Sequence, residues 1–185
     1  MSTISSRDQH LAWNHRATTT APDSIALTST AFAENGRIPT RHAGKIVGGS
    51  NVSPPLAWTG LPAEAVEVAL IVEDPDAPLP RPFVHCVVIG IPADITGIQE
   101  GAISTRSTDT APPFTVGKAS MGLSGYVGPA PIDPRPHRYI FQLFALDQPT
   151  GLDDQVSKKL VLQAIHGHIV ARGRLTGIYL HRRTP

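Results

Sequence analysis

One acid and two histidines are the residues of this chain that could do chemistry together. Asp74 stands at the end of one apolar run, His85 lies inside the next, and His137 comes just before a third. Two imidazoles can donate hydrogen bonds to phosphate oxygens, and a carboxylate beside them can orient an imidazole and favour its charged form. The same groups could instead perform general acid–base catalysis or hold a metal ion. The residue types therefore favour an anion site and leave a catalytic or metal site open.

The acid belongs to a rigid charged bend, because residues 74–78 read Asp-Pro-Asp-Ala-Pro. Proline lacks an amide donor and fixes its own φ, so this segment cannot lie inside a helix or a central strand. Loops at strand ends commonly carry binding residues. If this bend lines a binding cavity, we expect Asp74 to face the cavity, while Asp76 holds the loop in shape.

Three apolar runs predict the strands that position these groups. The run Val66–Val72 is apolar on both faces, which is typical of a central strand, and the runs Phe83–Ile91 and Tyr139–Leu146 resemble it. A histidine in a strand with two apolar faces is ordinarily a hydrogen-bonded core residue. That interpretation stays open for His85 and His137.

The remaining patterns predict a mainly β protein. We expect a short strand at 56–58 and a last strand at 175–180. Between them lies one good helix, which Asp153 or Asp154 can cap and Gly173 can end. Together these elements predict an antiparallel β-sandwich with a C-terminal helix.

The first part of the chain differs from the rest. Residues 1–22 show no sustained apolar periodicity, so we expect a loosely ordered N-terminal arm or a segment that packs only on a partner. Residues 23–185 are expected to form one globular domain, since a chain of 185 residues can bury a sizeable core.

The composition excludes several classes of protein. A net charge of +1 from 16 basic and 15 acidic residues gives no field strong enough for nucleic acid. Cys86 is the only cysteine, which excludes an intrachain disulfide, and its apolar surroundings favour a buried structural thiol. No apolar segment suits a secretory signal or spans a bilayer, so we expect a cytoplasmic protein.

Motifs of common enzyme classes are missing. There is no phosphate-binding P-loop and no dinucleotide fingerprint, and residues 122–126, Gly-Leu-Ser-Gly-Tyr, fail the last position of a nucleophile elbow. His166 and His168 would diverge by roughly 200° on a helix, so they favour a structural or surface role. We expect no enzymatic activity and no cofactor.

Several motifs resemble one known family. Residues 51–58 look like a Ser-Pro-x-Leu-x-Trp entry, and residues 74–78 look like an Asp-Pro-Asp-Ala-Pro box. Residues 125–139 are similar to a second box, Gly-x-x-Pro followed by His-Arg-Tyr. From about Ser24 to Tyr179 the chain resembles the phosphatidylethanolamine-binding protein family, which includes Raf kinase inhibitor proteins, and its tail is similar to the bacterial and archaeal branch.

The resemblance implies an anion pocket and its residues. Carried over by position, the pocket would use the following residues: Asp74, Pro75, His85, Gly128, Pro129, His137 and Tyr139. Backbone donors in the Gly-Pro loop would add contacts without adding charge. Two departures matter: Cys86 stands where the family often has a bulky residue, and a cis peptide bond is predicted at Arg81–Pro82.

The resemblance implies a binding protein. Its ligand would be phosphate, a phosphorylated small molecule or a phospholipid head group, and it could regulate a kinase or a protease. The alternative is a hydrolase or metal-dependent enzyme that uses Asp74, His85 and His137. A third hypothesis is an interaction module with a vestigial pocket. The apolar β faces and the N-terminal arm make a homodimer reasonable.

Overall fold

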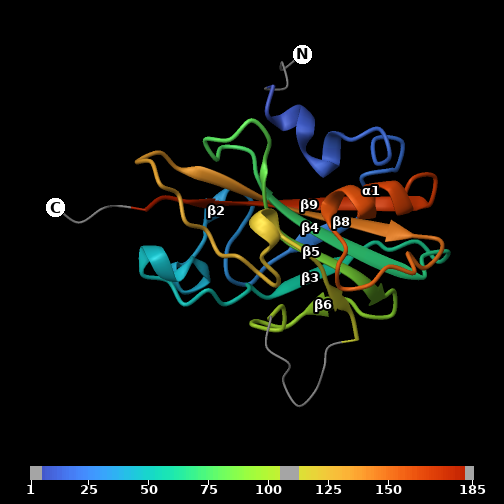
Figure 1. Cartoon of the computed structure of the whole chain (residues 1–185). Helices are drawn as coiled ribbons and strands as arrows, with labels where there is room; N and C mark the ends of the chain where they lie inside the picture. The colour runs from blue at the N-terminus through green and yellow to red at the C-terminus, as the bar shows by residue number, and fades with distance from the viewer. Residues whose placement is uncertain (1–5, 105–112, 182–185) are drawn as a thin grey trace.

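Two β-sheets form most of the protein. The computed structural model describes residues 6–104 and 113–181, and Figure 1 shows the sheets with the single labelled helix to one side. The larger sheet has six strands in the order β2-β9-β8-β4-β5-β7. Their bounds are β2 Gly36–Arg37, β9 Ile169–Tyr179, β8 His137–Leu146, β4 Glu67–Asp74, β5 Phe83–Pro92 and β7 Thr115–Val116. The smaller sheet has three strands, β1 Ala26–Thr28, β3 Leu56–Thr59 and β6 Gly97–Ile98.

The larger sheet is mixed rather than wholly antiparallel. Its long strands pair antiparallel, as expected, but β2 pairs parallel with β9. Asn35, in the left-handed conformation with φ of 58°, turns the chain into β2, and its amide donates to the Thr176 carbonyl. The prediction of a mainly β protein is confirmed, whereas this edge departs from the expected antiparallel arrangement.

The one α-helix among the described residues is shorter than predicted. Helix α1 covers Lys158–Ala164, and β9 follows it. Gly167, with φ of 86°, turns the chain between the two. Gly173 does not end the helix; it lies inside β9, where a Cβ atom would stand 2.2 Å from the Ile25 carbonyl oxygen. The glycine therefore reflects a close approach of two backbones.

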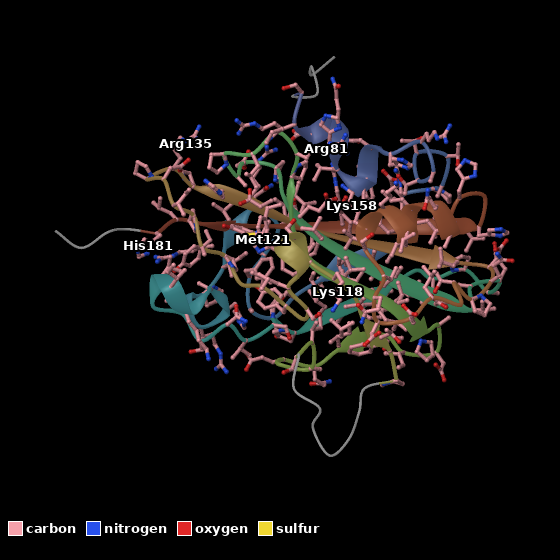
Figure 2. The ribbon with its side chains drawn as sticks, in the orientation of Figure 1. Arg81, Lys118, Met121, Arg135, Lys158 and His181 are labelled. Carbon is pink, nitrogen blue, oxygen red and sulfur yellow. The ribbon has the colours of Figure 1, made fainter. Side chains whose placement is uncertain are left out.

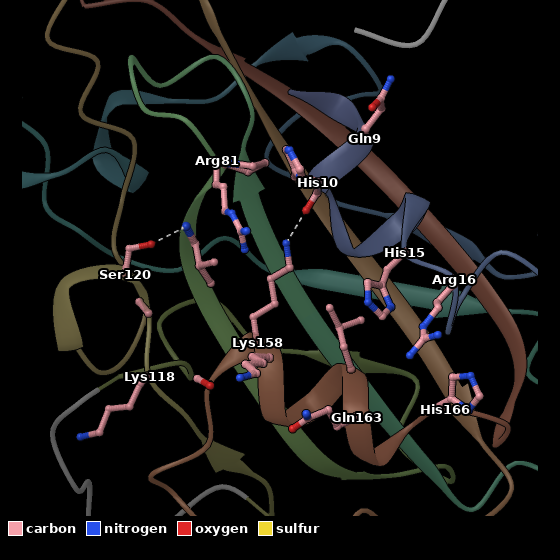
Figure 3. Close-up of a pocket in the computed structure, with 16 residues that line it drawn as sticks. Gln9, His10, His15, Arg16, Arg81, Lys118, Ser120, Lys158, Gln163 and His166 are labelled. Atoms are coloured by element: carbon pink, nitrogen blue, oxygen red, sulfur yellow. Dashed lines mark hydrogen bonds between the residues drawn. The ribbon is translucent and has the colours of Figure 1, made fainter. Parts of the chain in front are cut away.

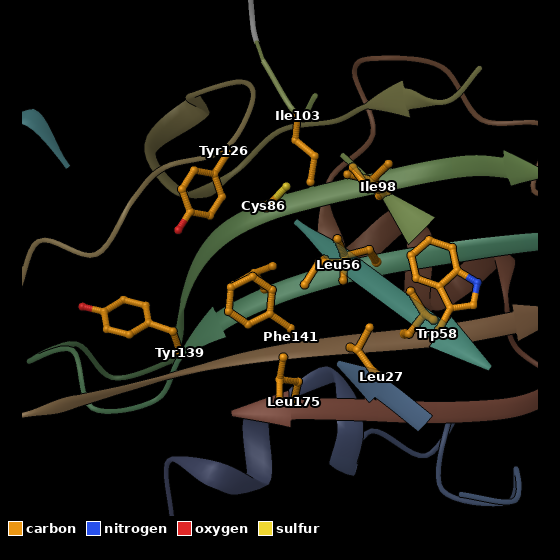
Figure 4. Close-up of a cluster of buried hydrophobic side chains, with 14 of the residues drawn as sticks. Leu27, Leu56, Trp58, Cys86, Ile98, Ile103, Tyr126, Tyr139, Phe141 and Leu175 are labelled. Carbon is orange, nitrogen blue, oxygen red and sulfur yellow. The ribbon is translucent and has the colours of Figure 1, made fainter. Parts of the chain in front are cut away.

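Strand β4 is buried on both faces and divides the core, as its two-sided apolar pattern predicts. Val68, Leu70 and Val72 face a cluster that includes Leu27, Trp58 and other side chains of the small sheet (Figure 4). Ala69 and Ile71 face a second cluster, which α1 and the N-terminal segment cover. The period of two along a strand produces this division.

The N-terminal segment packs against the large sheet. It forms two 3-10 helices, η1 Asp8–His10 and η2 Ala12–Asn14. Trp13 is 6% exposed, its ring lies 6.5 Å from that of Phe144, and its amide donates to Gln142 Oε1. The described part of this segment is therefore not a loosely ordered arm. Its short 3-10 turns give no helical or strand periodicity, which is why the sequence pattern missed them.

Three further 3-10 helices lie in the connections, η3 Thr40–His42, η4 Lys45–Val47 and η5 Ser120–Gly122. The described residues contain no cis peptide bond, so the predicted cis bond at Arg81–Pro82 is wrong. Cys86 is fully buried, as predicted, and burial raises the pKa of its thiol to about 12. None of the helices in the described segments is long and apolar enough to cross a membrane.

Candidate functional site

Strand periodicity brings the predicted polar residues to one end of the large sheet. Asp74 follows Val72 on the same face of β4, and His137 precedes Tyr139 on the same face of β8. Asp74, His85, His137 and Tyr139 are all buried, with 1–5% of each residue exposed. The consecutive strands β4 and β5 and the more distant β8 thus contribute to one polar cluster at the end of the sheet.

A β-bulge aims His85 at this cluster. Glu73 pairs with Val84 and Val72 pairs with Cys86, so His85 is an extra residue without an opposite partner. His85 and Cys86 consequently lie on the same face of the sheet. The His85 ring lies 5.0 Å from that of Tyr139 in an edge-to-face arrangement.

The Asp74 carboxylate shapes the bend and holds a histidine. Its Oδ1 accepts from the amides of Asp76 and Ala77 at 2.7 and 2.9 Å, which closes the turn over the buried Pro75. Its Oδ2 accepts from His137 Nδ1 at 2.8 Å. Asp74, which we expected to face the cavity, therefore also holds the loop in shape, a role that we had predicted for Asp76.

Asp76 fixes the bend to the neighbouring strand. Its carboxylate accepts from the backbone amide of Arg138 at 2.9 Å and from the guanidinium at 2.7 Å. Burial raises the pKa of Asp76, but the hydrogen bonds and charge of Arg138 outweigh it, so the pKa lies below its usual value. Arg138 also binds Asp8 in the N-terminal segment. This ion-pair network locks the bend in place.

His137 lies between two carboxylates. Besides the bond to Asp74, its Nε2 lies 3.2 Å from Asp133 Oδ1. Carboxylates accept hydrogen bonds, so both ring nitrogens donate and the ring is an imidazolium. Burial lowers the pKa of His137, but the hydrogen bonds and charges of Asp74 and Asp133 outweigh burial and raise it. Asp133, which was not among the predicted site residues, reaches the ring from the loop four residues earlier in the chain.

His85 is neutral by contrast. The carbonyl oxygen of Val127 lies 2.6 Å from His85 Nδ1, so this nitrogen carries the hydrogen and donates it. Nε2 of the neutral ring is then an acceptor. Burial lowers the pKa of His85 and outweighs the opposing hydrogen bond to Val127. The two histidines therefore offer opposite chemistry, a cationic donor and a neutral acceptor.

The Gly-Pro loop positions the site without offering the donors we expected. The amide of Gly128 donates to Asn51 Oδ1 at 2.7 Å, and Pro129 has no amide hydrogen. A Cβ atom on Gly128 would lie 2.4 Å from the His42 carbonyl oxygen, so only glycine fits. The Pro129 carbonyl accepts from the Gly44 amide at 2.8 Å. The backbones of Gly128 and Pro129 thus fix this loop to the segment 42–51.

Two tyrosines complete the polar cluster. The hydroxyls of Tyr126 and Tyr139 are buried and donate to no acceptor among the described residues, although the Ala130 backbone lies beside the Tyr139 hydroxyl. Figure 4 shows both hydroxyls directed away from the apolar side chains of the core. Buried hydroxyls are normally paired, and an unpaired pair of them in one region is typical of a place that a water or ligand fills. Tyr126 was not among the predicted site residues.

Fold and site together define a mainly β protein with a buried polar site at one end of its large sheet. Residues 28–180 match the family model described as phosphatidylethanolamine-binding protein, and the chain belongs to this family. The resemblance inferred from the two sequence boxes is confirmed. Residues 8–21, which cover one face of the sheet, precede the matched region.

Relatives come from archaea and bacteria. A UPF0098 protein of Methanothermobacter thermautotrophicus is 41% identical over 154 residues, which cover 83% of this chain and 97% of the relative. The solved structure of the homologue CT736 from Chlamydia trachomatis has a TM-score of 0.74 and 31% identity, covering 88% of this chain and 99% of that one. YbcL of Escherichia coli has a TM-score of 0.79 and 28% identity, with coverage of 86% and 99%. These relatives support the predicted bacterial and archaeal branch.

Proposed function

We propose that this protein binds a small ligand with a phosphate group at the site formed by Asp74, His85 and His137. The observation that carries the proposal is the buried imidazolium of His137, which both carboxylates hold in one orientation. The unpartnered hydroxyls of Tyr126 and Tyr139 add two donors nearby. A cationic donor with neutral donors around it matches the oxygens of a phosphate.

The two histidines define the protonation state of the ligand. His137 Nε2–H, which now contacts Asp133, would donate to a phosphate oxygen. His85 Nε2 would accept from a P–OH group or another ligand hydroxyl, because its Nδ1–H is committed to Val127. The arrangement therefore favours a singly protonated phosphate monoester. Inorganic phosphate and phosphoethanolamine carry such a P–OH group, whereas the phosphodiester of a phospholipid head group does not and would need another donor, such as its ammonium group, for His85 Nε2.

Binding without turnover is the function that these contacts support. His137 carries hydrogen on both nitrogens, so it does not offer the lone pair that a general base needs. The hydrolase hypothesis thus gains no support from His137, and it would have to use the neutral His85 as the base. Regulation of a kinase or protease, formation of a homodimer and location in the cytoplasm remain predictions.

Calorimetric titration with inorganic phosphate and with phosphoethanolamine between pH 5.5 and 9 would test the proposal. We expect one site whose affinity falls as the pH rises through the pKa of His137, which lies above the ordinary value of about 6.5, because the ring then loses its proton. Vesicles that contain phosphatidylethanolamine would distinguish a lipid head group from a soluble phosphate. Affinity that does not change with pH would contradict a role for the imidazolium.

Variants separate a ligand site from a core histidine. His85→Ala and His137→Ala are each expected to weaken phosphate binding at least tenfold while circular dichroism shows an intact fold. His168→Ala is the matched control, since His168 pairs with Asp147 at 3.0 Å in an exposed position. If His85→Ala or His137→Ala unfolds the protein, the core interpretation is correct for that residue.

A further inference from the structure

A groove on the opposite face of the large sheet is separate from the candidate site. It has a volume of about 760 Å³ and lies between the N-terminal 3-10 helices, α1 and the start of β5 (Figure 3). Leu162, which lines it, belongs to the core cluster beneath α1, and Val84, also in the lining, packs against that cluster. In Figure 2, Arg81 and Lys158 mark this region, whereas Arg135, which pairs with Asp133, lies toward another end of the molecule.

Basic side chains dominate the lining of the groove. The described lining residues include no aspartate and no glutamate, but they include three histidines and five lysines and arginines: Arg16, Arg81, Lys118, Lys158 and Lys159. The whole chain has a net charge of only +1, so this concentration of one sign is local. Such a cleft attracts anions more strongly than the overall charge would.

Two of the five basic side chains already have partners. Lys158 Nζ donates to the buried Glu73 carboxylate and to the His10 carbonyl, which fixes the N-terminal segment to α1. Lys118 Nζ donates to Ser124 Oγ and points away from the groove in Figure 3. Arg16, Arg81 and Lys159 form no ion pair within the described ranges. Their charges are available to a ligand.

His15 responds to this excess of positive charge. Its Nδ1 accepts from the Ala17 amide at 3.2 Å, so the neutral ring carries its hydrogen on Nε2. Burial lowers the pKa of His15, and the charges of Arg16, Lys158 and His166 lower it further. Lys158 is matched by the Glu73 carboxylate, whereas Arg16, Arg81 and Lys159 are not matched by any carboxylate among the described lining residues.

We propose that this groove binds a small molecule that carries two or more phosphate groups. Arg81 lies near Lys158 and His10 at one end, while Arg16 lies near His15 and His166 at the other (Figure 3). Two separate basic centres fit an elongated polyanion better than a single phosphate. Arginine binds phosphate oxygens in a bidentate manner, and the volume is typical of a small-molecule site.

Other polyanions fit the groove less well. Its described lining contains no phenylalanine, tyrosine or tryptophan on which the bases of a single-stranded nucleic acid could stack. Its basic groups line a hollow rather than a flat face, so a bilayer surface would not reach all of them. The wall from His10 to Arg16 lies before the matched region 28–180, so the groove depends on a segment outside the family match.

Isothermal calorimetry with sodium tripolyphosphate, at physiological salt and with the full chain, would test the proposal. We expect one binding site whose affinity falls about tenfold for Arg16→Gln and for Arg81→Gln, the loss of one charge-assisted hydrogen bond each. Both side chains are exposed, so thermal unfolding should not change. Arg37→Gln, an exposed arginine on β2 outside the groove, should bind like the wild type.

His137→Ala separates this groove from the candidate site, because it should leave tripolyphosphate binding to the groove unchanged. The proposal is overturned if the double variant Arg16→Gln/Arg81→Gln binds tripolyphosphate like the wild type, or if Arg37→Gln weakens binding equally. It is also overturned if the protein binds single-stranded RNA or anionic vesicles but not tripolyphosphate. Loss of binding in His137→Ala alone would assign the ligand to the other site.

Discussion

Asp133 places its Oδ1 atom 3.2 Å from Nε2 of His137, a ring whose other nitrogen is held by Asp74. The Asp133 carboxylate thus takes the hydrogen bond that an anionic ligand would accept. It is itself held by Arg135 at 2.7 Å, and the hydrogen bonds from Arg135 keep the pKa of Asp133 well below its usual value. A ligand must therefore displace a carboxylate that stays ionised over the whole physiological range.

Asp133→Asn is expected to raise the affinity for phosphate about fivefold or more, because an amide competes less well than a carboxylate for the imidazolium. Calorimetry at pH 6.5 measures the change. Asp147→Asn serves as the control, since Asp147 pairs with His168 in an exposed position away from the site. Unchanged or weaker binding by Asp133→Asn would show that Asp133 assists the ligand rather than competing with it.

The raised pKa of His137 makes a pH-dependent contribution to stability. Because the folded-state pKa exceeds the unfolded value of about 6.5, this contribution is fully present below about pH 6.5 and is lost as the pH rises through the folded-state pKa. The difference in free energy of unfolding between wild type and His137→Gln should therefore shrink between pH 6 and 9. Urea denaturation measures it.

His85 acts in the opposite direction. Its folded-state pKa is lowered by burial, so it destabilises the fold as the pH falls below about 6.5. Burial, the largest cause, acts alike in wild type and His137→Gln and cancels in their difference, so only the smaller part due to the His137 charge remains. A stability difference that grows with pH would contradict the charged state assigned to His137.

Trp13→Ala is expected to reduce the free energy of unfolding by about 3–5 kcal/mol, the usual cost of removing a large buried aromatic side chain. The Trp13 ring packs under the Arg172 guanidinium at 4.1 Å, and its carbonyl accepts from the same group. Urea denaturation tests this. Ile46→Ala is the control, because Ile46 is 87% exposed. A cost below about 1 kcal/mol would mean that the N-terminal segment is held only weakly.

Lys158→Met is expected to cost about 3–5 kcal/mol, because it leaves the fully buried Glu73 carboxylate without its cation. Adding Glu73→Gln should recover part of this loss, since the amide carries no charge. Lys159→Met, at the neighbouring exposed lysine, should change stability by less than about 0.5 kcal/mol. If the double variant is no more stable than Lys158→Met alone, the pair does not act through charge neutralisation.

The central strands could be predicted because each carries its own apolar pattern. The runs Val66–Val72, Phe83–Ile91 and Tyr139–Leu146 match β4, β5 and β8 within two residues. The start of β9 could not be predicted in this way, because Arg172 and Arg174 interrupt its pattern. Arg172 is buried because of tertiary contacts: it donates hydrogen bonds to Asp23 and to carbonyl oxygens of the N-terminal segment.

The site could be predicted only in part for a similar reason. Asp74, His85 and His137 were predicted by their types and by the sequence boxes, and the structure places them in one polar cluster. Asp133 could not be predicted, because its role depends on how the loop before β8 folds back over the His137 ring. The hydrogen bond from the Gly128 amide to Asn51 could not be predicted either, because it joins residues 77 positions apart.

Because of the bulge at His85, the site depends on the number of residues in this part of β5 as well as on their types. With regular pairing, the same residues in the same order would send this imidazole to the side of the sheet that α1 covers. Deleting His85, the one residue between Val84 and Cys86, would leave a continuous strand and an empty position beside Tyr139. A homologue that keeps the histidine but differs by one residue in this spacing would therefore share the strand and not the site.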